Sequence, residues 1–101
     1  MAISDVQIDG TWIRVYDEKG KQKSTMAHNS KEIVGVASDF FVVLDGTWIR
    51  TFDENCKQIA TMANQSSYVI KGAAGNSFTI KDGSWIRTFD RNCKQTGTRS
   101  A

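Results

Sequence analysis

The sequence predicts an all-β protein built from tandem copies of one strand unit, and three observations lead to this prediction. First, a 14-residue block occurs three times, at residues 9–22, 45–58 and 82–95, and repetition at a fixed period indicates a repeat architecture. Second, polar and apolar residues in and around the block alternate with the period of two that is typical of strands. Third, turn-forming residues stand at the breaks between the alternating segments.

The period of the repeat follows from its three tryptophans. Trp12, Trp48 and Trp85 are separated by 36 and 37 residues. The copies that this spacing defines cover about 3–38, 39–75 and 76–101. The first copy lacks its opening segment. We therefore expect one all-β repeat domain that covers the whole sequence, residues 1–101.

Each complete copy is expected to form four short antiparallel strands. The first strand covers residues 32–37 and 68–74, and the second covers 6–8, 40–44 and 77–81. The third strand covers 11–16, 47–52 and 84–89, and the fourth covers 21–27, 57–63 and 94–98.

Two kinds of turn follow the second and third strands. The Asp-Gly pairs at 9–10, 45–46 and 82–83 predict tight hairpins, because glycine adopts positive φ at little cost. The third strands are followed by Asp-Glu-Lys-Gly, Asp-Glu-Asn-Cys and Asp-Arg-Asn-Cys. In these turns the left-handed residues are expected at Gly20, Asn55 and Asn92.

Each complete copy is expected to be a four-stranded meander, and the copies follow one another head to tail. Asp-Gly precedes the third strand, which ends in an aromatic residue and Asp, and Gly-Lys or Cys-Lys follows in the next turn. This layout resembles the blades of WD-type β-propellers. The Gly-His and Trp-Asp dipeptides of the WD family are absent. The resemblance implies blades around an axis, with small residues where the innermost strands crowd. Gly35 and Ala37, and then Gly72, Ala73 and Ala74, fit this expectation.

An incomplete set of blades does not close a ring, and we expect it to expose strand edges and two large apolar faces. Homo-oligomerisation should cover these faces, and a homodimer of about six blades, some of them three-stranded, is the expected state. The alternative is a pseudo-threefold monomer, a β-prism or β-trefoil, which also builds about twelve strands from three copies.

The third strand of each copy places a tryptophan and an arginine on one face. The candidate ligand-binding residues are Trp12, Arg14, Trp48, Arg50, Trp85 and Arg87. Our preferred interpretation is a core between neighbouring units, with each arginine stacked on tryptophan or paired with a repeated aspartate. The other interpretation is an aromatic platform beside a guanidinium, able to bind a sugar or a carboxylate.

The sequence contains no recognisable catalytic or metal-binding set. Its only histidine is His28, and Cys56 and Cys93 occupy equivalent turns too far apart for a disulfide. We expect no enzymatic activity, no metal and no cofactor, and two free thiols. The repeated aspartates are expected to accept hydrogen bonds in the turns.

Charge and hydropathy limit the partners. The net charge of +2 is too small for a dedicated nucleic-acid surface, and the longest apolar runs, such as residues 40–44, are too short to span a bilayer. The sequence has no signal-peptide pattern, so a cytoplasmic location is expected. The predicted function is a non-enzymatic binding or interaction module on a self-associating scaffold, with a protein or carbohydrate ligand. Lectin-like binding through the Trp/Arg sites and a purely structural assembly role are the alternatives.

Overall fold

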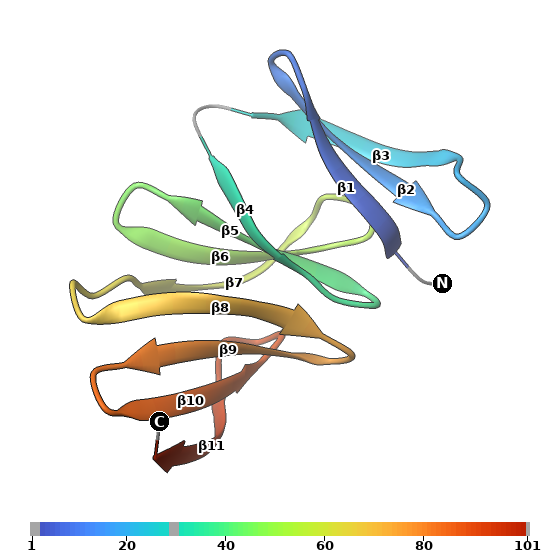
Figure 1. Cartoon of the computed structure of the whole chain (residues 1–101). Helices are drawn as coiled ribbons and strands as arrows, with labels where there is room; N and C mark the ends of the chain where they lie inside the picture. Colours follow the sequence, from blue (N-terminus) through green and yellow to red (C-terminus); the bar gives the residue numbers. More distant parts are fainter. Residues whose placement is uncertain (1–2, 29–30, 101) are drawn as a thin grey trace.

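The computed structural model describes residues 3–28 and 31–100, and in these residues it contains strands and no helix (Figure 1). Residues 1–2, 29–30 and 101 of the expected domain lie outside the described residues. The strands are β1 (Ile3–Asp9), β2 (Trp12–Asp17), β3 (Gln22–Ala27), β4 (Glu32–Val36), β5 (Phe40–Asp45), β6 (Trp48–Asp53), β7 (Gln58–Ala63), β8 (Tyr68–Ala74), β9 (Ser77–Asp82), β10 (Trp85–Asp90) and β11 (Gln95–Ser100).

The strands form three antiparallel sheets in which each strand pairs with its neighbours in the chain. The first sheet has the order β1-β2-β3, the second β4-β5-β6-β7 and the third β8-β9-β10-β11. The predicted all-β class and the four-stranded unit are confirmed, and the first sheet has only the last three strands of the unit. Each later sheet takes its first strand from the end of the preceding sequence copy.

Both kinds of predicted turn are present, with one correction. The Asp-Gly hairpins place Asp45 directly opposite Trp48, and Gly46 has a φ of 63°. In the turns after the third strands the left-handed residues are Gly20, Cys56 and Cys93, with φ values of 77°, 62° and 60°. The expectation for Asn55 and Asn92 was therefore wrong. The turn wraps around an aspartate carboxylate, and this places the fourth turn residue, rather than the third, at positive φ.

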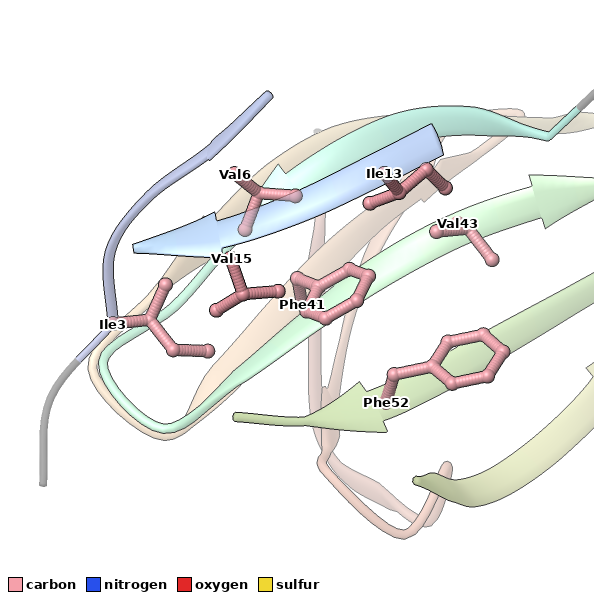
Figure 2. Packing of buried hydrophobic residues seen from close by; sticks show 7 residues of the cluster. All are labelled: Ile3, Val6, Ile13, Val15, Phe41, Val43 and Phe52. Carbon is pink, nitrogen blue, oxygen red and sulfur yellow. The ribbon is translucent and has the colours of Figure 1, made fainter. Parts of the chain in front are cut away.

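The second sheet lies between the other two and is buried on both faces (Figure 1). One face packs against the first sheet in a cluster of Ile3, Val6, Ile13, Val15, Phe41, Val43 and Phe52 (Figure 2). The rings of Phe41 and Phe52 stack there at 5.6 Å between centroids. The other face packs against the third sheet in a cluster of Ala37, Phe40, Val42, Ile49, Phe78, Ile80 and Phe89.

The sheets approach each other most closely through their first strands. The Ser38 N–H and hydroxyl both donate to the carbonyl of Gly75, at 3.1 and 2.7 Å, and Gly35 of β4 lies against Ala73 of β8. The close backbone approach predicted from the small residues is thus confirmed for Gly35. The approach requires glycine, because a Cβ at this position would stand 3.0 Å from Ala73.

The same arrangement differs from the alternative expectation, a pseudo-threefold β-prism or β-trefoil monomer. Strands of one sheet do not pair with those of another, and the described residues form no closed barrel, so the β-trefoil expectation was wrong. The second sheet is covered on both faces, unlike a prism, in which each sheet turns one face inward. The structure measures 39 × 26 × 18 Å along its principal axes.

The outer faces of the two end sheets are polar, which corrects the expectation of two large apolar faces. On the first sheet Asp5 stands opposite Tyr16, where the second sheet has Phe41 opposite Phe52. On the third sheet Lys81 stands opposite Ile86, at the position that Leu44 holds in the second sheet. Polar outer faces are a common feature of the terminal units of repeat arrays.

Candidate functional site

The three tryptophans are the first residues of β2, β6 and β10, directly after the Asp-Gly hairpins. In Figure 1 the β5–β6 and β9–β10 hairpins lie on the left side of the molecule, and the β1–β2 hairpin lies at the top. Trp12, Trp48 and Trp85 are 47%, 45% and 47% exposed. The interpretation of the tryptophans as core residues is therefore wrong. Trp48 and Trp85 stand at the turn end of the strand, beyond the part that the neighbouring sheet covers, and Trp12 lies on the outer face of the first sheet.

The other end of the same strand face does belong to the core. Phe52 and Phe89 follow each tryptophan by four residues and are 6% and 5% exposed. Their counterpart Tyr16 lies on the outer face of the first sheet and is half-buried. One strand face thus carries a core aromatic at one end and an accessible indole at the other.

Each arginine lies between these two aromatics and is paired with the aspartate of its own sheet. The Nε atoms of Arg14 and Arg87 donate to Asp9 and Asp82 at 3.0 and 2.9 Å. Each aspartate stands directly opposite the tryptophan of its sheet, so carboxylate and indole are neighbours. The predicted arginine–aspartate pairing is confirmed.

The second sheet varies this pattern slightly. Arg50 Nε lies 3.2 Å from Asp45 Oδ2 as an ion pair, but the direction of the N–H does not give a hydrogen bond, and the buried Nε has no hydrogen-bond partner. The guanidinium is held mainly by its Nη1, which donates to Gln58 Oε1 at 3.0 Å.

A glutamine completes each cluster, and our sequence analysis missed it. Nη1 of Arg14 donates to Gln22 at 2.8 Å, and Nη1 of Arg87 contacts Gln95 at 3.3 Å. The signal was available, because this glutamine is identical in all three copies. Each guanidinium is therefore fixed on two sides, and its remaining N–H groups are directed by those contacts rather than free to rotate.

The third sheet adds one more contact. The hydroxyl of Ser67 donates to Asp82 Oδ1 at 2.7 Å. Together with the hydrogen bond from Arg87, this hydroxyl lowers the pKa of the Asp82 carboxyl. The carboxylate therefore stays ionised and remains a hydrogen-bond acceptor beside Trp85.

A second set of repeated aspartates shapes the turns. Asp17 Oδ1 accepts from the backbone N–H groups of Lys19 and Lys21 at 2.9 and 3.0 Å, and the bonds to Asp53 and Asp90 repeat this arrangement. The same backbone donors lower the pKa of Asp17. The predicted turn hydrogen bonding of these residues is confirmed.

Cys56 and Cys93 are free thiols in equivalent turns of different sheets, as expected. Burial raises the pKa of both thiols, so little thiolate forms at neutral pH. Cys56 Sγ lies 3.2 Å from the hydroxyl oxygen of Ser24 in the neighbouring sheet. Within residues 3–28 and 31–100, no three histidine, cysteine or acidic side chains gather to hold a metal ion.

Two hollows on the outer faces were not anticipated from the sequence. One, of about 380 Å³, lies on the third sheet and is lined by Lys71, Ser77, Thr79, Ile86 and Arg99 together with residues 72–74. The other, of about 370 Å³, lies on the first sheet and is lined by Ser4, Asp5, Gln7, Tyr16 and Gly20. One is basic and the other acidic.

Comparison with protein-family models and with curated proteins finds no match to this chain. In the described part of the chain, no helix has the length and apolar character needed to cross a membrane.

Proposed function

We propose that the three sheets are blades of a propeller-type array, and that the chain is a non-enzymatic module that binds saccharides at its repeated Trp–Arg sites. The observation that supports this proposal best is the equal, half-exposed state of Trp12, Trp48 and Trp85. A tryptophan needed only for folding would be buried. The same large indole is instead kept accessible three times, each time beside a fixed arginine and a carboxylate.

The chemistry of one site suits a sugar ring. An exposed indole offers a flat apolar surface on which the C–H face of a pyranose can stack, while its edge remains polar. The neighbouring aspartate and glutamine accept hydrogen bonds from hydroxyl groups, and the guanidinium donates to them. Because Arg87 is already held by Asp82 and Gln95, little side-chain freedom is lost on binding.

The repetition suits an oligomeric ligand. The hairpins beside the second and third sites, β5–β6 and β9–β10, lie on the same side of the array (Figure 1), so a ligand with several sugar units can engage more than one site. Linked sites convert weak individual contacts into higher overall avidity. The blade interpretation is supported by the stacked meanders and by the close approach of β4 and β8.

The absence of enzymatic activity is also part of the proposal. The thiols have raised pKa values, which makes them poor nucleophiles at neutral pH. The ring of His28 contacts the backbone carbonyl of Lys31 and serves the local loop. Two unpaired thiols suit a reducing compartment, and we propose a cytoplasmic location.

A glycan array of neutral and acidic oligosaccharides tests this function, followed by titration of the best-bound oligosaccharide with tryptophan fluorescence as the readout. Each single Trp→Ala variant should weaken binding, and the triple variant should abolish it. Arg50→Lys should also weaken it, because an ammonium does not reproduce the directed contacts of the guanidinium. Val69→Ala, which removes an exposed apolar side chain on the opposite face of the third sheet, should bind normally. Failure of every glycan to bind would overturn the proposal.

A further inference from the structure

The first and third sheets each have one outer face that no other part of the described chain covers. In the first sheet this face carries Asp5, Gln7, Asp9, Trp12, Arg14 and Tyr16. In the third sheet it is the opposite face, which carries Val69, Lys71, Thr79, Lys81, Ile86 and Arg99. We call these the acidic end face and the basic end face.

The two end faces correspond to the two sides of an interface that already occurs twice in the molecule. Ile86 of the basic end face stands at the position of Ile13 and Ile49, which are fully buried against the next sheet. Tyr16 of the acidic end face stands at the position of Phe52 and Phe89, which are buried against the preceding sheet. Each end face therefore has, in Ile86 or Tyr16, a counterpart of a residue that is buried in the interfaces between sheets.

The polar residues that surround these central residues have opposite charge. The basic end face carries Lys71, Lys81 and Arg99. The acidic end face carries Asp5, Asp9 and Arg14; because Arg14 is paired with Asp9, the net negative charge of this face is that of Asp5. Complementary charge of this kind favours association and fixes its register.

The hollow on the basic end face lies where a following sheet would pack. Between the second and third sheets, a Cβ at Gly35 would meet Ala73 at 3.0 Å. At Gly72, the equivalent glycine of the third sheet, nothing stands within 4 Å of a Cβ position, and this glycine lines the hollow of about 380 Å³. The acidic end face has a hollow of similar size.

We propose that the basic end face of one copy binds the acidic end face of a second copy, and that two copies close a ring of six sheets. The contact joins two different faces, so each copy uses both of its end faces. Such an assembly forms a closed ring only if the rotations between successive sheets add up to one full turn. Closure requires that the rotation between successive sheets of one chain also relates the last sheet of one copy to the first sheet of the other.

This inference is independent of the saccharide proposal. Trp48 and Trp85 lie on faces that are covered by a neighbouring sheet, yet they remain 45% and 47% exposed. Covering the acidic end face in the same way leaves Trp12 accessible. Self-association and saccharide binding can therefore succeed or fail separately.

The experiment is sedimentation velocity of the whole chain at micromolar concentration, with two charge reversals. The native chain should sediment with twice the mass of a single chain and dissociate as salt is raised. Asp5→Lys alone and Lys81→Glu alone should each sediment as monomers, with dissociation constants raised about tenfold or more. An equimolar mixture of the two variants should recover the dimer, because both contacts of the mixed ring pair opposite charges again.

Lys57→Glu is the matched control, since it makes the same charge change at an exposed turn of the second sheet and should leave the dimer intact. Circular dichroism of each variant should match the native spectrum, and recovery in the mixture shows that both variants fold. A monomeric native chain, an assembly of any other size, a dimer indifferent to both reversals or a mixture that stays monomeric would overturn the proposal.

Discussion

Gly35 of β4 and Ala73 of β8 lie so close together that a Cβ atom added at Gly35 would stand 3.0 Å from both the Cβ and the backbone nitrogen of Ala73. Gly35→Val should therefore destabilise the fold by about 1–3 kcal/mol, because the first strands of two sheets would be forced apart. Gly97→Val is the control. Nothing lies within 4 Å of a Cβ there, so urea unfolding should show little change for it, and equal losses for both variants would contradict the packing described.

The two ends of strand β6 should respond differently to truncation. Phe52 is buried, so Phe52→Ala should cost about 3–5 kcal/mol. Trp48 is half-exposed, so Trp48→Ala should cost at most about 2 kcal/mol. Both values can be measured by denaturant unfolding. A loss at Trp48 as large as that at Phe52 would mean that the indole is a core residue.

Cys56 has a φ of 62°, a conformation that side chains with a Cβ adopt only at a cost. Cys56→Gly and Cys56→Ala both remove the thiol and its contact with Ser24, but only glycine removes the backbone strain. Allowing for the greater flexibility of glycine in the unfolded chain, we expect the glycine variant to be more stable than the alanine variant by about 0.5–1 kcal/mol. The first copy already has Gly20 at this position. Equal thermal stability of the two variants would remove the strain argument.

Acid should destabilise the protein through Asp17 and Asp82. Both pKa values are lowered in the folded state, so the folded chain binds fewer protons than the unfolded chain near pH 4. The contribution of these carboxylates to stability is complete above their ordinary pKa of about 3.9 and is lost as the pH falls through the lowered values. Asp82→Asn should give a flatter stability profile below about pH 4, and a profile as steep as the native one would assign the loss to other groups.

Much of the fold could be predicted from the sequence, because a three-fold repeat supplies the same local information three times. Most strand bounds, the Asp-Gly hairpins and the close approach at Gly35 follow from period, turn chemistry and residue size. The first strand, expected over 6–8, is longer and spans Ile3–Asp9, and the last, expected over 94–98, ends at Ser100. The sequence could not place Trp48, because alternation assigns a side chain to a face but does not say how far along that face the next sheet extends. The core interpretation failed for this reason at Trp48 and held at Phe52.

The polar end faces are recognisable in the sequence. Asp5 and Lys81 occupy positions that are apolar in the second sheet, but the average pattern of the repeat hides these differences between copies. The positions at which one copy differs from the others, rather than the positions that all copies share, identify these polar residues. The left-handed cysteines were missed for another reason, since residue preferences favour asparagine and the wrapped carboxylate overrides that preference.

Among the described residues of a single chain, the second sheet alone is enclosed on both sides, by Phe41 and Phe52 toward one neighbour and by Phe40 and Ile49 toward the other. Either end sheet can unfold while the remaining pair stays together, whereas opening the middle one disrupts both clusters at once. In the dissociated chain, amide hydrogens of β5 and β6 should accordingly exchange with deuterated solvent most slowly, with exchange quickening toward β3 and β11.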